Sequence, residues 1–433
     1  MKKKVCMFVW NHFTNDARVL RECSALAEAG YTVDLIAIHD HKNPTLPRRE
    51  MRPEGFTVIR VKNELKGLSL LSGAVKRVTA IVKFNLFTKL GVIIAAAAFI
   101  RYMPFLAMLF FLLILLFFPR KLRTLYLRTY ILMQMVVFGL AKHYDIVHSN
   151  DLNTMPQGFL CARLFRRRVF IYDSHEVQTS RTGYNSRIYG IAERFFIKHI
   201  DVMIMENHTR AKYIEDLYGF YPRVVHNYPV TYKRAESHKV DLYEVLDIPR
   251  GEPILLYQGG IQTGRGLDKL ILATPKFERG VVVLIGDGKL KPELMEMVKS
   301  MNLEDRVRFM PKVPVEELLN YTRNAYLGFQ ILNNVCFNHY SASSNKLFEY
   351  IMSSVPVVAC SFPEIQKVVE QENIGVCVDS HNPESIAEAV NYLLNHPEDY
   401  QLKKANCSYA KAKYNWENEK KLFLEIHSQL EAI

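Results

Sequence analysis

One uncharged apolar stretch constrains this chain of 433 residues more than any other feature. Residues 91–100 (GVIIAAAAFI) and 105–118 (FLAMLFFLLILLFF) contain no charged side chain, and only residues 101–104 (RYMP) separate them. A helix that is apolar on every side needs cover all round, from protein or from lipid. The longer run would extend about 21 Å as a helix, against roughly 30 Å for the hydrocarbon core of a bilayer. We therefore expect an apolar α-helical membrane insertion within residues 68–140.

Basic residues flank this insertion on both sides, and they are Lys76, Arg77, Lys83, Lys89, Arg120, Lys121, Arg123 and Arg128. Such flanks are typical of a segment whose two ends both stay in the cytoplasm. The chain then either dips in and returns as a re-entrant hairpin broken at Pro104 or crosses twice, and both remain open. A buried helical hairpin in a soluble core is the alternative. We expect a protein at the cytoplasmic face of the cell membrane, inserted by residues 85–118.

The composition fits a globular protein outside this stretch. Hydrophobic residues make up 49% and charged residues 23% of the chain, enough for sizeable cores in two or three domains. The formal net charge of +12 suits anionic partners. No zinc-type cluster or RNA-binding aromatic motif appears, so we expect no nucleic-acid partner. The seven scattered cysteines fit a reducing compartment better than a disulfide framework.

Strand and helix patterns alternate on both sides of the insertion. Before it, residues 4–10, 17–30 and 31–38 read as strand, helix and strand, which implies a right-handed βαβ unit. After it, the alternation resumes near residue 145 and continues beyond a polar linker at 231–250. Two such blocks predict an α/β protein with two Rossmann-like domains facing a cleft.

The predicted domains have the following limits. The N-terminal domain covers residues 1–228, with the membrane-associated insertion at 68–140 inside it. The C-terminal domain covers residues 229–413. A last amphipathic helix at residues 414–433 is expected to pack back on the first domain.

A glycine loop and a later helix carry the clearest chemistry. Gly259 and Gly260 follow a buried strand, and glycines there let backbone amides approach an anion. Arg265 in the same loop and Lys346 at the head of the later helix supply cations for phosphate. Glu349, one helical turn after Lys346, can accept hydrogen bonds from ribose hydroxyls. An ordinary turn and a Lys–Glu surface pair are the alternatives.

Polar residues also follow two strands of the first block. His148 and Asp151 close one strand, and Asp173, His175 and Glu176 close the next. Since the carboxyl ends of parallel strands are where α/β folds bind ligands, we expect a functional role here. The residues fit no zinc spacing, so neither a metal nor another cofactor is expected.

The ordered set of motifs resembles the retaining glycosyltransferases of family 4, which have the GT-B fold. The matching motifs are DARVLRE at 16–22, YDSHE at 172–176, NYP at 227–229, Gly259-Gly260 with Arg265-Gly266, GDG at 286–288, and KLFEY at 346–350 with PVV at 356–358. They span nearly all of the chain except residues 66–140. The resemblance implies transfer of a sugar from a UDP- or GDP-linked donor with retained anomeric configuration and without a metal.

The resemblance makes residues 1–228 the acceptor domain and residues 229–413 the nucleotide-sugar donor domain, and it also implies roles for individual residues. Arg265 and Lys346 would hold the diphosphate and His175 would lie beside the donor sugar, and these three form the expected catalytic group. Glu349 would bind the ribose, and the backbone near Lys312 the base. The other expected substrate-binding residues are Asn15, Asp16, Asp151, Glu176, Gly259, Gly260, Gly286, Ser344, Asn345 and Leu347.

Two positions depart from the family pattern. Gly260 stands where the family often has an arginine, and Ser341 stands where the first of two paired glutamates is expected. We expect a lipid-linked or glycan acceptor, in bacterial surface polysaccharide or glycolipid synthesis. A nucleotide-sugar epimerase of the same fold and an inactive membrane scaffold are the alternatives.

Overall fold

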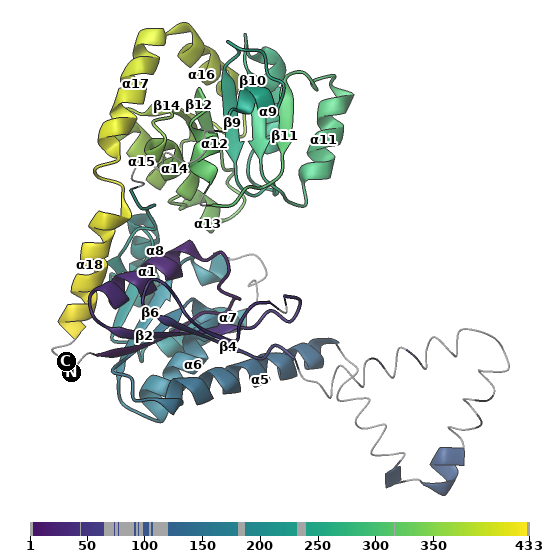
Figure 1. Cartoon of the computed structure of the whole chain (residues 1–433), viewed down its shortest axis with the longest axis vertical. Helices are drawn as coiled ribbons and strands as arrows, with labels where there is room; N and C mark the ends of the chain where they lie inside the picture. Colours follow the sequence, from purple (N-terminus) through teal and green to yellow (C-terminus); the bar gives the residue numbers. More distant parts are fainter. Residues whose placement is uncertain are drawn as a thin grey trace. The chain divides into compact units, whose positions relative to one another are not determined.

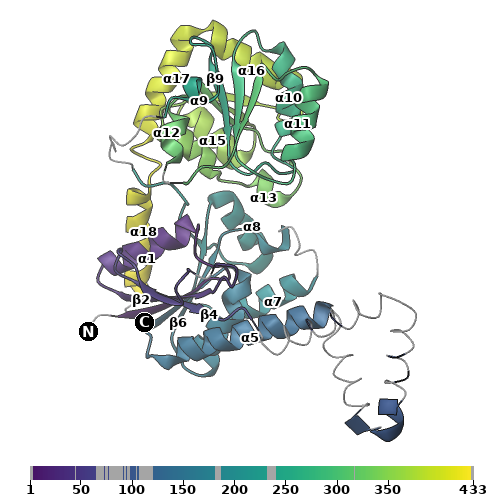
Figure 2. The same cartoon turned by 45° about the vertical axis from the view of Figure 1, so that its right-hand side comes forward.

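The computed structural model describes residues 3–43, 45–64, 120–180, 187–231, 240–315 and 317–430, with short pieces between 73 and 106. Most of the expected membrane-inserted segment at 85–118 therefore lies outside the described residues. The chain forms two compact units, residues 1–172 with 199–201 and residues 173–198 with 202–433 (Figures 1 and 2). The domain boundary at residue 228 and the packing of the last helix on the first domain stay predictions.

The first sheet has eight strands in the order β3-β4-β2-β1-β5-β6-β7-β8, and the boundary between the two units falls inside β6. Its strands are β1 Lys4–Phe8, β2 Thr32–Ile38, β3 Arg49–Met51, β4 Thr57–Val61, β5 Ile146–Asn150, β6 Val169–Ser174, β7 Val202–Met205 and β8 Arg223–Val224. β1 pairs in parallel with both β2 and β5, so that Val5 lies opposite Val33 on one side and Ile146 on the other. The short edge strand β3 is antiparallel to β4.

Helices cover both faces of the first unit's sheet. Helix α1 (Ala17–Glu28) lies on one face, and α5 (Arg120–Ala141) and α6 (Met155–Phe159) lie on the other (Figures 1 and 2). Helix α1 begins at Asp16, whose side chain accepts a hydrogen bond from the Val19 amide, as an N-cap does. It buries Val19, Cys23 and Leu26 on one face, at the spacing that places side chains over a sheet.

The second sheet has six parallel strands in the order β11-β10-β9-β12-β13-β14. They are β9 Ile254–Gln258, β10 Val281–Ile285, β11 Val307–Met310, β12 Leu327–Gln330, β13 Val357–Cys360 and β14 Gly375–Val378. Side chains of alternate strand residues enter two separate cores, because successive residues of a strand point to opposite faces. The predicted pair of Rossmann-like domains is thus confirmed.

The helices described in the second unit mostly cover the second sheet. They are α7 Arg187–Ile197, α8 His208–Tyr218, α9 Leu242–Val245, α10 Leu267–Ala273, α11 Lys291–Ser300, α12 Leu318–Thr322, α13 Phe337–Tyr340, α14 Asn345–Met352, α15 Pro363–Gln371, α16 Pro383–Asn395, α17 Pro397–Ala410 and α18 Trp416–Gln429.

The strand order of the second sheet reverses between β9 and β12. From β9 the chain moves outward to β10 and β11, and from β12 it moves the other way to β13 and β14. Ligands of open α/β sheets bind beyond the carboxyl ends of the strands at such a reversal. The loops that follow β9 and β12 are therefore where a site is expected in this unit.

Candidate functional site

The loop after β9 is shaped by glycine. Gly259 and Gly260 are both exposed, and Gly259 has a φ of +123°, which side chains rarely tolerate. A Cβ at Gly259 would lie 2.7 Å from Cε of Lys346, so any larger residue would displace that lysine. The Gly259 amide donates to the Ile285 carbonyl at 2.9 Å, which ties the loop to the end of β10.

Arg265 stands between two glycines, Gly264 and Gly266, that have φ values of +81° and +69°. The Gly264 carbonyl accepts a hydrogen bond from the Asn333 amide at 2.9 Å. Gly266 packs directly on the Ile331 carbonyl, where a Cβ would collide. The loop after β9 is thereby joined to the loop after β12, and this junction positions the Arg265 guanidinium.

Lys346 lies at the start of α14, half-buried, with its ammonium nitrogen 5.5 Å from the centre of the Tyr257 ring. Burial, and after it the positive charge of Arg265, lower the pKa of Lys346 from 10.5 to about 7. Two cations held together in this way favour an anion between them, because an anion relieves their repulsion. The structure thus brings together Gly259, Arg265 and Lys346 as the sequence predicts.

Glu349 is held by a residue that the sequence analysis did not select. Gln258, the last residue of β9, donates from Nε2 to a Glu349 carboxylate oxygen at 2.6 Å. The Thr322 hydroxyl in turn donates to the Gln258 side-chain oxygen at 2.7 Å. This chain of contacts fixes the carboxylate of Glu349 beside the glycine loop. The signal in the sequence was a glutamine closing an otherwise apolar strand.

The loops after β10 and β11 meet at Asp287. Its carboxylate accepts hydrogen bonds from the Lys312 amide at 3.1 Å and from the Lys291 ammonium at 3.0 Å. These two contacts, the amide first, lower the pKa of Asp287. Lys291 also donates to the Gly286 carbonyl at 3.0 Å. The predicted substrate-binding residues Gly286 and Lys312 are therefore neighbours, and Lys291 is a further residue of this corner.

The loop from Asn333 to Ser344 places His339 next to the loop after β9, which contains Gly264 and Arg265. Its Nδ1 lies 3.2 Å from the Asn333 carbonyl, and a Cβ at Gly264 would lie 2.7 Å from its Cε1. Burial, followed by the charge of Arg265, lowers the pKa of His339. Sequence reasoning missed His339, because nothing in the local pattern shows that this loop folds back over Gly264.

The three residues predicted around the start of α14 play different parts. The Ser344 hydroxyl donates to the side-chain oxygen of Gln330 at 2.9 Å. Asn345 is exposed and accepts a hydrogen bond from the Asn227 side chain at 3.2 Å. The Leu347 side chain is buried in the core of the second unit, so its backbone is the part open to a ligand role.

Ser341, where the family pattern has a glutamate, is buried and bound to helix α8. The Arg210 guanidinium donates to its hydroxyl at 3.2 Å, and Asn207 donates to its carbonyl at 2.8 Å. The Ser341 hydroxyl itself donates to the Phe337 carbonyl at 2.7 Å. The Ser341 hydroxyl therefore both accepts and donates a hydrogen bond within the protein.

The same arginine reaches the segment that contains His175. Arg210 donates to the carbonyls of His175 at 2.8 Å and Asn338 at 3.0 Å, and it pairs with Glu206 at 2.7 Å. The Asn338 side chain adds two hydrogen bonds with the backbone of Val177, at 2.9 and 3.0 Å. The buried guanidinium of Arg210 thus connects the segment that contains His175, the predicted catalytic histidine, to the loop that contains Ser341, where the family pattern has a glutamate.

His175 and Glu176 follow β6 and are both half-buried. The His175 Nε2 lies 3.8 Å from a carboxylate oxygen of Asp173, close enough for that carboxylate to orient the ring. The Glu176 carbonyl accepts hydrogen bonds from Ser174 and Gln178, which close a tight turn. The turn presents the two side chains beyond the strand end.

The predicted residues of the first unit are placed less distinctively. Asn15 is exposed. The Asp16 carboxylate is used as the cap of α1 and also accepts from the Asn11 side chain at 2.7 Å. Asp151 follows β5 with a φ of +62°, a backbone conformation uncommon for aspartate. Their roles toward a substrate stay predictions.

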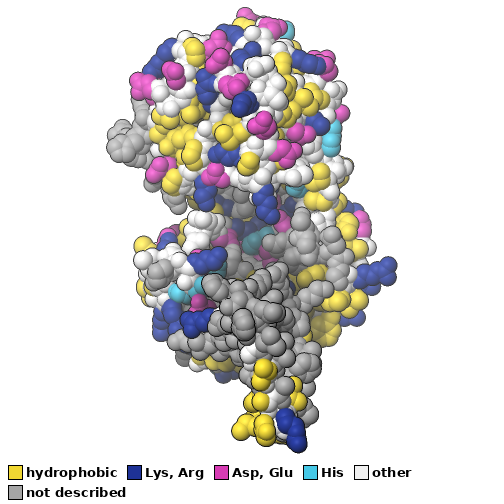
Figure 3. All heavy atoms as spheres, turned by 90° about the vertical axis from the view of Figure 1, so that its right-hand side faces the viewer, with side chains coloured by type: hydrophobic (Ala, Val, Ile, Leu, Met, Phe, Trp, Pro, Cys, Tyr) yellow, Lys and Arg dark blue, Asp and Glu magenta, His cyan; other side chains and the backbone are white. Residues whose placement is uncertain are grey.

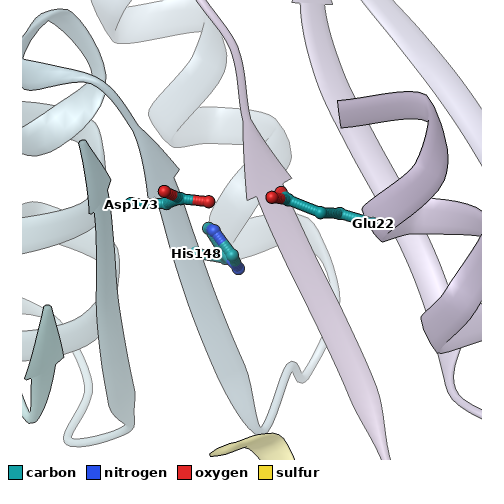
Figure 4. Close-up of side chains that lie close together, drawn as sticks. All are labelled: Glu22, His148 and Asp173. Atoms are coloured by element: carbon teal, nitrogen blue, oxygen red, sulfur yellow. The ribbon is translucent and has the colours of Figure 1, made fainter. Parts of the chain in front are cut away.

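Glu22, His148 and Asp173 lie close together, as Figure 4 shows, with one ligand-type atom of each within 4.8 Å of the others. Asp173 continues strand β6 directly from Tyr172, and His148 lies in the middle of β5, opposite Met7 of β1. All three side chains are buried, and Glu22 pairs with Arg18 at 2.9 Å. His148 is therefore an interior residue, and its predicted position at an open strand end is wrong.

Comparisons with known proteins agree with the fold. Residues 241–413 match the family model described as glycosyl transferases group 1. The D-inositol 3-phosphate glycosyltransferase of Kineococcus radiotolerans is 25% identical over 322 residues, which are 66% of this chain and 72% of that protein. Sucrose-phosphate synthase from Thermosynechococcus elongatus has a TM-score of 0.74 at 17% identity, with both chains covered at 100%. Anabaena HepE in complex with UDP-glucose has a TM-score of 0.67 at 15% identity, with 98% and 99% covered.

These similarities define the class of protein. The solved structures show the fold, which is the pair of parallel-sheet Rossmann-like domains of GT-B glycosyltransferases. The family model covers the unit that carries the glycine loop, Arg265 and Lys346. Together with the curated relative, it supports a glycosyltransferase.

Proposed function

We propose that the protein is a retaining glycosyltransferase that moves a hexose from a UDP- or GDP-linked sugar to a lipid-linked or glycan acceptor. The observation that carries this proposal is the cationic corner made by Lys346 and Arg265 against Gly259. Such a corner stabilises the negative charge that develops on a leaving diphosphate. Glu349, fixed by Gln258, is placed to accept hydrogen bonds from the ribose of the same nucleotide.

The proposed reaction divides the chemistry among few groups. The bond between the anomeric carbon and the diphosphate breaks, and the electron pair leaves with the diphosphate. The acceptor hydroxyl attacks from the same face and gives its proton to the leaving phosphate. His175 orients the donor sugar, and Asp173 orients His175. No metal or other cofactor is expected in this scheme.

A membrane location supports the choice of a lipid-linked acceptor. Most described side chains near the centre of the predicted insertion are apolar and exposed, among them Ile100, Tyr102 and Phe105, and Arg101 lies between them. Figure 3 shows hydrophobic side chains with a basic one at the lower end of the molecule. Exposed apolar groups of this size need a partner other than water. We propose that residues 85–118 hold the enzyme at the cytoplasmic face of the membrane, next to its acceptor.

Membranes that contain the full chain provide the test. They are incubated with UDP- and GDP-linked radiolabelled sugars, and label in the lipid extract and free nucleotide are measured. We expect label in lipid, and loss of both signals in the Arg265→Ala and Lys346→Ala variants. Unchanged turnover in these variants overturns the proposed site.

The same assay separates the alternatives. Conversion of the sugar while it stays on the nucleotide indicates an epimerase. Nucleotide binding without release or conversion, from any donor, indicates an inactive scaffold. The anomeric configuration of the product, read by NMR coupling constants, tests retention, and an inverted product overturns that part of the proposal.

A further inference from the structure

The outward face of helix α5 (Arg120–Ala141) is largely apolar. One row at four-residue spacing is exposed along its whole length and consists of Leu125, Thr129, Met133, Val137 and Ala141, of which only Thr129 is polar. Leu125 is 57%, Met133 53% and Val137 63% exposed. A helix of a soluble protein normally turns polar side chains outward. We therefore expect this row to contact something other than water.

The opposite face of α5 is bound to the first sheet. Ile131 and Met135 are buried, and a Cβ at Gly139 would lie 2.7 Å from the Phe8 ring. The Gln134 side chain exchanges hydrogen bonds with the amide and carbonyl of Lys62, at 3.1 and 3.0 Å. In the described part of the chain, residues 122–141 form a helix long and apolar enough to cross a membrane. The contacts with Phe8 and Lys62 hold α5 along the face of the sheet. In this position α5 is placed like a helix that lies on a membrane surface, not like one that crosses the membrane.

Two further exposed apolar residues lie beside the C-terminal end of α5. Leu164 and Phe165, which end the turn after α6, are 60% and 59% exposed. The next residue, Arg166, donates to the carbonyls of Leu140 and Lys142 at 3.3 and 3.2 Å, and so fixes the pair beside α5. We call the exposed row of α5 together with Leu164 and Phe165 the α5 face.

The charges around the α5 face have one sign. Residues 120–143 contain five Lys or Arg and no Asp or Glu, and residues 155–168 contain four and none. Lys142 and Arg163 pair with Asp34 and Asp201. Arg128 and Arg167 are exposed. An apolar stripe with a mainly basic border is complementary to the surface of an anionic bilayer.

We propose that the α5 face rests on an anionic lipid bilayer and holds the first unit flat against it. This inference rests on the membrane location in the proposed function, because α5 begins at residue 120, directly after the apolar run that ends at residue 118. A chain that leaves the bilayer at that point starts α5 at the lipid surface. The sheet would then lie parallel to the membrane, with α5 as the contact.

Tryptophan quenching in the full-length protein tests this contact. Met133→Trp places an indole on the α5 face, and Tyr409→Trp places one on α17, where Tyr409 is 75% exposed. Both variants are reconstituted into vesicles with or without brominated phosphatidylglycerol, and the unsubstituted chain corrects for its own two tryptophans. We expect brominated lipid to remove most of the added emission in Met133→Trp and almost none in Tyr409→Trp.

Three results would overturn the proposal. Equal quenching of the two variants shows that the α5 face does not touch lipid. Blue-shifted but unquenched emission of Met133→Trp shows that protein covers the face, either residues 91–118 or a second copy. Equal quenching in phosphatidylglycerol and in purely zwitterionic vesicles overturns the requirement for anionic lipid. A chain that does not sediment with vesicles contradicts the membrane location itself, and the transfer assay is independent of all these readouts.

Discussion

Titratable side chains lie beyond the end of β9 in the second sheet and within β5 and β6 in the first sheet. Beyond β9, Gly259 is exposed, and Arg265 and Lys346 are only half-buried. Along β5 and β6, His148 and Asp173 are fully buried. A position near a strand end therefore does not make a site. The backbone beyond the strand must also open the side chain to a ligand, and glycines do this after β9.

The largest expected effect concerns the cationic corner. Lys346→Ala removes one of the two cations that would hold the diphosphate, and we expect about 100-fold slower sugar transfer, as for other lost electrostatic donors. The exposed Lys404 on α17 provides the matched control, and Lys404→Ala should leave the rate unchanged. Initial rates with a radiolabelled nucleotide sugar measure this. Comparable rates for the two variants would remove the corner from the mechanism.

Arg210 tests whether the corner depends on a buried scaffold. Arg210→Met leaves Glu206 and two carbonyls without their donor, and we expect a loss of about 3–5 kcal/mol in unfolding free energy, typical of a broken buried pair. Arg250→Met breaks the exposed pair with Asp241 and should cost about 0–1 kcal/mol. Denaturant unfolding gives both values. Hydrogen exchange should also rise at residues 336–344 in Arg210→Met alone.

His148 tests the buried side of the comparison. His148→Ala leaves a cavity next to Glu22, and we expect a loss of about 2–4 kcal/mol in unfolding free energy, as in other large-to-small core changes. Nucleotide affinity should stay at the native value. His143→Ala, an exposed change in the same unit, should alter neither quantity. A large drop in affinity for His148→Ala, with the fold intact, would mean that the buried group serves the site.

Two glycines separate backbone strain from the contact with Lys346. Gly259 and Gly251 both have left-handed φ values, +123° and +101°, so alanine costs about 1–2 kcal/mol at either. Only at Gly259 would the new Cβ meet Lys346, since nothing lies within 4 Å at Gly251. We expect roughly tenfold weaker nucleotide binding in Gly259→Ala, from loss of about one charged contact. Gly251→Ala should bind the nucleotide with unchanged affinity. Calorimetry would contradict this if the two variants bound alike.

The smallest expected effect is a pH dependence. Because the pKa of Lys346 is lowered to about 7, the unliganded lysine loses its proton as the pH rises through neutrality. A diphosphate needs the charged form, so affinity for a nucleotide sugar should fall by up to about tenfold per pH unit above that value. Between pH about 7 and the ordinary pKa of 10.5, Lys346 carries fewer protons in the folded state than in the unfolded chain. The contribution of Lys346 to the free energy of unfolding therefore increases as the pH rises through this range. Lys346→Met should flatten both profiles, and unchanged slopes would argue against this lysine.

Local patterns were sufficient to predict most of the elements and much of the site. The strand predicted at residues 4–10 and the helix predicted at 17–30 were found as β1 Lys4–Phe8 and α1 Ala17–Glu28, because apolar periodicity reports burial directly. The edge strand β3 was missed, since three residues carry too little pattern. Arg265, Lys346 and Glu349 were predictable because glycines and charges beside a buried strand have few structural uses.

The sequence by itself determined the two alternating α/β blocks, the apolar run inside the first of them and the charges of the cationic corner. Only the tertiary structure decided which polar residues are buried together, such as Glu22 with His148, and which reach across loops, such as Arg210 to Ser341. It also showed that α5 is apolar on its outer face while its inner face packs on the sheet. The reason is physical: periodicity along a chain depends on neighbours in sequence, whereas burial and long-range hydrogen bonds depend on segments that meet only in the fold.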